Sequence, residues 1–73
     1  MPKKMATLKK EVIDHVETGK RVRAERERAE MSLRKLAHFM GISPPFLSDL
    51  ELGRRNWTKD RFDLAMRILN GNL

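Results

Sequence analysis

The chain lacks several residue types on which common kinds of function depend. Its 73 residues include no cysteine and no tyrosine. Without thiols it can form no disulfide, no cysteine–zinc site and no thiol nucleophile. The two histidines, His15 and His38, are too few to hold a metal on their own. We therefore expect neither an enzyme nor a metal or cofactor site, and the missing disulfides favour a cytoplasmic protein.

Long apolar runs are also missing. No stretch approaches the ~20 apolar residues of a membrane-spanning helix, and residues 1–10 are basic without the apolar stretch of a secretory signal. Alternation of apolar and polar residues, the pattern of a half-buried strand, is scarce. Hydrophobic residues make up 40% of the chain, which is enough for a small helical core.

What the chain has in excess is positive charge. It holds 16 Lys and Arg against 10 Asp and Glu, a formal net charge of +6. Such a charge indicates a polyanionic partner, either nucleic acid or an anionic membrane surface. Residues 1–35 hold 11 basic and 6 acidic side chains, whereas residues 36–73 hold 5 and 4. A membrane-surface helix at the N-terminus is disfavoured by Glu11, Asp14 and Glu17.

Apolar residues recur at helical spacing along the chain. Hydroxyl side chains suited to capping helix N-termini stand at Ser32, Ser43 and Thr58. Gly41 and Gly53 are placed to end helices, and Gly19 is expected to break or kink the chain between two of them. The expected helices, about five in number, occupy residues 7–17, 20–29, 32–40, 43–53 and 58–70.

The most informative segment is 32–52, where two short helices are joined by a tight connection. The small side chain of Ala37 lets the second helix approach closely, and Gly41 permits a turn with positive φ. Leu47 and Leu50 fill the space between the two helices. This spacing is typical of a helix-turn-helix, whose second helix enters the major groove of DNA.

From residue 19 to residue 69 the chain resembles the Cro and phage-repressor-type helix-turn-helix domains, also called the xenobiotic-response-element family. The resemblance is carried by the stretch GKRVRAERERAEMSLRKLAHFMGISPPFLSDLELGRRN. It implies an all-α, compact, lambda-repressor-like bundle of about five helices, with the helix-turn-helix at 32–52 and an extra N-terminal helix. Residues 1–18 would form an N-terminal extension, helical from about residue 7, and residues 19–70 the DNA-binding domain.

The function that this resemblance implies is a sequence-specific transcriptional regulator that binds double-stranded DNA. A homodimer would bind an inverted-repeat operator, and repression by occlusion is the expected mode. Two alternatives stay open: an antitoxin that binds its own promoter and a toxin partner, or a protein-interaction module that does not bind DNA. The apolar start of the second helix, Pro44-Pro45-Phe46, is the hint for the interaction module.

In the family, the outward positions of the second helix meet base edges. The matching residues are Ser43, Pro44, Pro45, Phe46, Ser48 and Asp49. Because they include no Arg, Asn or Gln, the strongest base pairings are absent. Base recognition would then depend on the hydroxyl groups of the two serines and on the Asp49 carboxylate as an acceptor for cytosine. The prolines and Phe46 would make apolar contacts with thymine methyl groups. On the plainer interpretation, Pro44 and Pro45 only stiffen the helix start and Phe46 packs internally.

Phosphate contacts supply most of the affinity for DNA and need positive charge and N–H donors in register. The family match assigns them to Ser32, Leu33, Lys35, Arg54, Arg55, Asn56 and Lys59. Leu33 stands where the family often has a polar side chain, so the backbone and Lys35 would make the contact there. The plainer interpretation is a solvated basic loop and simple capping by Ser32.

Two further features concern the scaffold. Arg26 and Glu51 match a charged pair that, in the family, ties the first domain helix to the second helix of the helix-turn-helix. Such a pair fixes orientation more than it adds stability. Trp57, the only tryptophan, is either a core residue over Leu50 and Phe62 or an anchor in a dimer interface.

Overall fold

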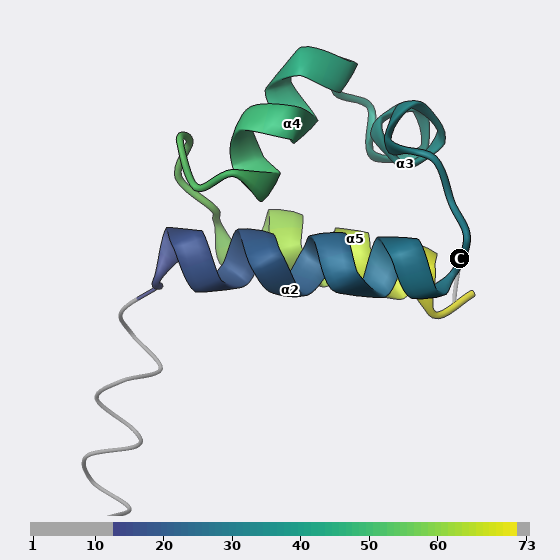
Figure 1. Cartoon of the computed structure of the whole chain (residues 1–73), viewed down its shortest axis with the longest axis horizontal. Helices are drawn as coiled ribbons and strands as arrows, with labels where there is room; N and C mark the ends of the chain where they lie inside the picture. Colours follow the sequence, from purple (N-terminus) through teal and green to yellow (C-terminus); the bar gives the residue numbers. More distant parts are fainter. Residues whose placement is uncertain (1–12, 72–73) are drawn as a thin grey trace, which may run out of the picture.

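The computed structural model describes residues 13–71 and contains four helices and no strand in that range. They are α2 (His15–Arg28), α3 (Leu33–Met40), α4 (Pro44–Glu51) and α5 (Lys59–Leu69). The all-α expectation is confirmed. The helix expected at 7–17 falls mostly on residues 1–12, outside the described part, so the expected total of five is not reached within residues 13–71. Figure 1 shows α2 and α5 side by side, with α3 and α4 over one side of this pair.

Gly19 does not break the chain, so that expectation is wrong. α2 runs through it from His15 to Arg28 and crosses the expected domain boundary between residues 18 and 19. The reason is a contact with a distant part of the chain: a Cβ atom at Gly19 would lie 2.5 Å from the carbonyl oxygens of both Leu50 and Glu51. The missing side chain lets the end of α4 pack directly on α2, despite the poor helix propensity of glycine.

The other helix ends follow the local chemistry of their residues. The hydroxyl groups of Ser32, Ser43 and Thr58 each accept a hydrogen bond from the backbone N–H three residues later, at 3.0, 3.2 and 3.1 Å. Each therefore satisfies one of the free N–H groups of a helix start. Gly41 follows α3 with a φ of 74° in the left-handed region, which glycine adopts without a steric penalty. These three N-caps and this helix end are confirmed.

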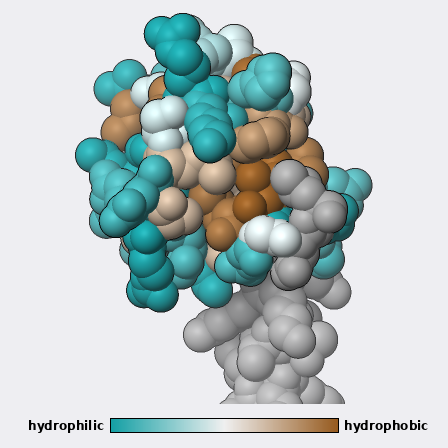
Figure 2. Space-filling view, turned by 90° about the vertical axis from the view of Figure 1, so that its right-hand side faces the viewer, coloured by the Kyte–Doolittle hydropathy of each residue, from teal (hydrophilic) through white to brown (hydrophobic). Residues whose placement is uncertain are grey.

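The hydrophobic core lies between the two pairs of helices. Its buried members are Val22, Leu36, Ala37, Met40, Leu47, Leu50, Trp57, Ala65 and Ile68. α2 packs on α4 and α5, and α3 packs on the same two helices. Viewed from the right-hand side of Figure 1, hydrophobic surface gathers in the middle of the face, within a largely hydrophilic surround (Figure 2). The described residues thus bury one face of each helix and leave the other to solvent or to a partner.

Trp57 belongs to this core. Its side chain is 2% exposed, and its indole Nε1–H donates a 2.9 Å hydrogen bond to the carbonyl oxygen of Leu50. The ring meets Phe62 edge-on, with the centroids 6.3 Å apart. Its backbone N–H donates to Nδ1 of His15 at 2.7 Å, so the start of α2 is tied to the start of α5. The core interpretation is confirmed, and a buried indole is not available as a dimer anchor.

Candidate nucleic-acid interface

α3 and α4 are arranged as a helix-turn-helix. The backbone N–H groups of Gly41 and Ile42 donate to carbonyl groups of α3 at 3.1 and 3.0 Å and close the turn. Ala37, Leu47 and Leu50 have no exposed surface, as their roles between the helices require. The first turn of α4 lies on the side of the molecule away from α2 and α5 (Figure 1). One face of α4 is therefore fixed in the core while its start projects outward.

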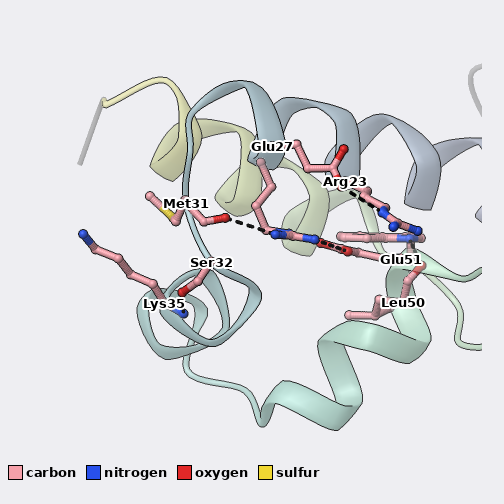
Figure 3. A network of polar contacts seen from close by, with 9 residues as sticks. Arg23, Glu27, Met31, Ser32, Lys35, Leu50 and Glu51 are labelled. Atoms are coloured by element: carbon pink, nitrogen blue, oxygen red, sulfur yellow. Dashed lines mark hydrogen bonds and ion pairs between the residues drawn. The ribbon is translucent and has the colours of Figure 1, made fainter.

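The orientation of α4 is set by the predicted ion pair. Arg26 Nε donates to Glu51 Oε2 at 2.8 Å, and Nη2 donates to Oε1 at 3.1 Å. Arg26 Nη1 also donates to the backbone oxygen of Met31 at 3.0 Å (Figure 3). The Glu51 side chain is only 4% exposed. The hydrogen bond that Arg26 donates to Glu51 raises the pKa of Arg26 above its ordinary value, although burial acts in the opposite direction. A bidentate and largely buried ion pair of this kind holds α4 at one angle to α2.

The outward face of α4 carries the residues expected to read bases. All of them are at least partly exposed: Ser43, Pro44, Pro45, Phe46, Ser48 and Asp49. The two prolines occupy the first two helical positions. An N–H group there would have no acceptor within the helix, so the prolines cost no hydrogen bond and stiffen the helix start. The carboxylate of Asp49 lies near an arginine of the following loop, with Oδ2 3.8 Å from Arg55 Nε. A base that approached Asp49 would therefore share it with Arg55.

Phe46 packs partly inside the domain and keeps part of its ring exposed. Its side chain is half-buried and packs against the core. The guanidinium carbon atoms of Arg55 and Arg61 lie 5.4 and 5.1 Å from its ring centroid. The internal-packing interpretation is thus correct for part of the ring. A contact between Phe46 and a base stays a prediction.

The loop after α4 brings three of the expected phosphate-binding residues together. Arg54, Arg55 and Asn56 are exposed and line one hollow with Phe46. Their donors therefore lie beside the start of α4, where a DNA strand would pass if α4 entered the major groove.

The remaining expected phosphate contacts lie elsewhere. Ser32 and Lys35 are exposed at the start of α3, whereas Leu33 packs against the core and shares a hollow with Ser48 of α4. Lys59 lines a separate hollow with Phe62. Its Nζ lies 2.9 Å from Asp63 Oδ2, and this hydrogen bond raises its pKa. Of the seven, Lys59 is the one that the structure places outside the loop cluster and away from the start of α3.

A comparison with known families decides what this arrangement is. The helix-turn-helix family model of the Cro/C1 type matches residues 22–73. The chain belongs to this helix-turn-helix family. No curated protein and no solved structure matches the chain. Within residues 13–71, no helix is long and apolar enough to cross a membrane.

Two side chains of this helix-turn-helix domain were missed at the sequence level. Arg61 could not be predicted to lie beside α4, because the spacing of the apolar residues in α5 does not reveal which of its polar residues faces α4. His15 was assigned no partner because Trp57, whose N–H it accepts, lies 42 residues away in the chain. The sequence holds no local signal for either contact.

Proposed function

We propose that the protein is a transcriptional repressor that binds a specific double-stranded DNA site as a homodimer. The observation that carries the proposal is the fixed, outward-facing start of α4 beside the basic loop of Arg54, Arg55 and Asn56. The chain's membership of a DNA-binding helix-turn-helix family supports it. The net charge of +6 gives the polyanion attraction that such binding needs.

In this proposal α4 lies in the major groove and reads the sequence mainly by shape, methyl groups and one acceptor. Asp49 would accept a hydrogen bond from cytosine N4. Pro44, Pro45 and the exposed part of Phe46 would contact thymine methyl groups. Arg54 and Asn56 would bind phosphates next to the groove, with the start of α3 as a second contact through Ser32 and Lys35.

Two copies would bind the two halves of an inverted repeat, with the α4 helices about 34 Å apart, one turn of DNA. The hydrophobic area on the face in Figure 2 offers surface for such an association. The bound dimer would block transcription by occupying the promoter, in the cytoplasm and without chemistry or a cofactor.

Selection of bound duplexes from a random DNA library tests the proposal. We expect a palindromic consensus whose half-sites are separated by about one helical turn. Failure to enrich any sequence at low salt would reject DNA binding and favour the protein-interaction module. Enrichment together with a second chain that co-purifies from the host would instead favour the antitoxin alternative.

A further inference from the structure

The side of α4 that holds Phe46 carries a pair of arginines from two different elements. Arg55 comes from the loop after α4 and Arg61 from the first turn of α5. Their guanidinium carbon atoms lie 5.4 and 5.1 Å from the centroid of the Phe46 ring. Both distances fall within the ~6 Å over which a cation is attracted to an aromatic face.

The two arginines differ in their other partners. Arg55 lies near Asp49, with 3.8 Å between Nε and Oδ2. Among the ion pairs within residues 13–71, none involves Arg61. Asp63, two residues further along α5, is paired with Lys59 at 2.9 Å. Asp60 lines a hollow with Arg61 but forms no ion pair with it. Within the described part of the chain, Arg61 therefore holds its charge against an aromatic ring with no carboxylate at ion-pair distance.

The position of Arg61 places that charge next to the helix-turn-helix. Arg61 lines a hollow with Gly41 and Ile42 of the α3–α4 turn, while its guanidinium group lies over the ring at the start of α4. A guanidinium group that rests on a ring keeps its edge N–H donors free, and their fork matches the oxygens of a phosphate.

The geometry points to Arg61 as a DNA phosphate contact, with Phe46 as the positioning residue that holds Arg61 and Arg55 beside the groove. This inference rests on the proposed function and assigns to α5 a part in DNA binding. It also gives Phe46 a role that needs no contact with a base. Two neighbouring phosphates on the same strand, with one negative charge each, would offset the charges of both arginines.

The test measures the affinity of the full chain for a short mixed-sequence duplex over a series of salt concentrations, by electrophoretic mobility shift. Arg61→Gln is compared with Arg67→Gln, which removes the same charge from an exposed position in the last turn of α5. We expect Arg61→Gln to weaken binding about tenfold, as the loss of a charged hydrogen bond does. The slope of log affinity against log salt should fall by about 0.9 for each lost contact. Arg67→Gln should leave the slope unchanged.

Two further variants keep the outcome interpretable. Phe46→Leu retains an apolar side chain and every charge. A smaller salt slope for this variant would therefore support the positioning role, whereas weaker binding with an unchanged slope would indicate only a lost apolar contact and would count against that role. Arg61→Lys keeps the charge without the planar fork and should fall between the parent and Arg61→Gln. Circular dichroism confirms that each variant is folded. Equal slopes for Arg61→Gln and Arg67→Gln would overturn the inference, whereas a parent chain without salt-dependent binding would reject the proposed function itself.

Discussion

At the scale of single residues, Arg26 shows how one side chain can define a binding surface without touching the ligand. Its three hydrogen bonds join α2, the carboxylate of Glu51 at the end of α4 and the backbone of Met31. The family match predicted the pair with Glu51, because both positions carry the expected residue types. It could not predict the bond to Met31, since a backbone acceptor leaves no mark in the residue sequence.

Arg26→Ala should lower the free energy of unfolding by about 3 kcal/mol, because it leaves the buried Glu51 carboxylate without a partner. Since the pKa of Arg26 is raised, its stabilising effect is fully present below the ordinary pKa of arginine and is lost only at still higher pH. The effect should therefore be constant across neutral pH. Urea unfolding of both chains measures it.

The matched control is Arg23→Ala, which breaks the exposed pair with Glu27 one turn away on the same helix. Exposed pairs of this kind contribute about 0.5 kcal/mol or less. Equal losses for the two variants would mean that the buried pair has no special weight in the fold.

Asp49 is the residue whose substitution should change the sequence that is read. Asp49→Asn replaces an acceptor for cytosine with a side chain that pairs with adenine. We expect the selected consensus to change at one position of each half-site, and binding to the parent site to weaken by about 1–3 kcal/mol. Arg54→Gln should instead weaken binding to all sequences alike. An unchanged consensus for Asp49→Asn would place Asp49 outside the base contacts.

At the scale of helices, the caps could be read from the sequence and the packing could not. Ser32, Ser43 and Thr58 cap helices through bonds to residues three positions away, so local sequence contains both partners. The prediction of a break at Gly19 was wrong because the need for glycine comes from the end of α4. The carbonyl groups of Leu50 and Glu51 that approach Gly19 lie about 30 residues later in the sequence. The contact of Arg61 with Phe46 escaped prediction for the same reason.

Gly19→Ala tests the close approach of α4 to α2. In an exposed helix this change would stabilise the protein by about 0.5–1 kcal/mol. Here the added Cβ would lie 2.5 Å from two backbone oxygens, and backbone atoms cannot move aside independently. We expect a loss of about 1–3 kcal/mol in thermal or urea unfolding.

The reverse change on the same helix, Ala24→Gly at an exposed position, calibrates the propensity effect. It should cost about 1 kcal/mol. A Gly19→Ala protein more stable than the parent would show that α4 stands further from α2 than the structure places it.

At the scale of the whole molecule, the small core implies a small free energy of unfolding. A chain of this length is typically stable by about 4–11 kcal/mol, and the removal of a buried leucine side chain costs about 2–5 kcal/mol. Leu47 has no exposed surface, whereas Leu52, one and a half turns later, is 48% exposed. The same substitution at these two positions should therefore have very different effects.

Leu47→Ala should lower the free energy of unfolding by about 2–5 kcal/mol, while Leu52→Ala should change it by no more than about 0.5 kcal/mol. Helix content followed by circular dichroism during heating distinguishes the two. Duplex DNA should raise the melting temperature of Leu47→Ala, because it binds the folded state only. A Leu52→Ala chain that melts as early as Leu47→Ala would show that the exposed leucine is covered, as in a dimer.

The buried indole of Trp57 gives the protein an internal optical reporter. The chain has one tryptophan and no tyrosine, so its near-ultraviolet fluorescence comes from a single site. That site is bonded to Leu50 at the end of α4 and lies against Phe62 of α5. Unfolding would expose the ring to water and shift its emission to the red, whereas DNA bases would not reach it. Emission wavelength therefore reports folding separately from binding in one titration.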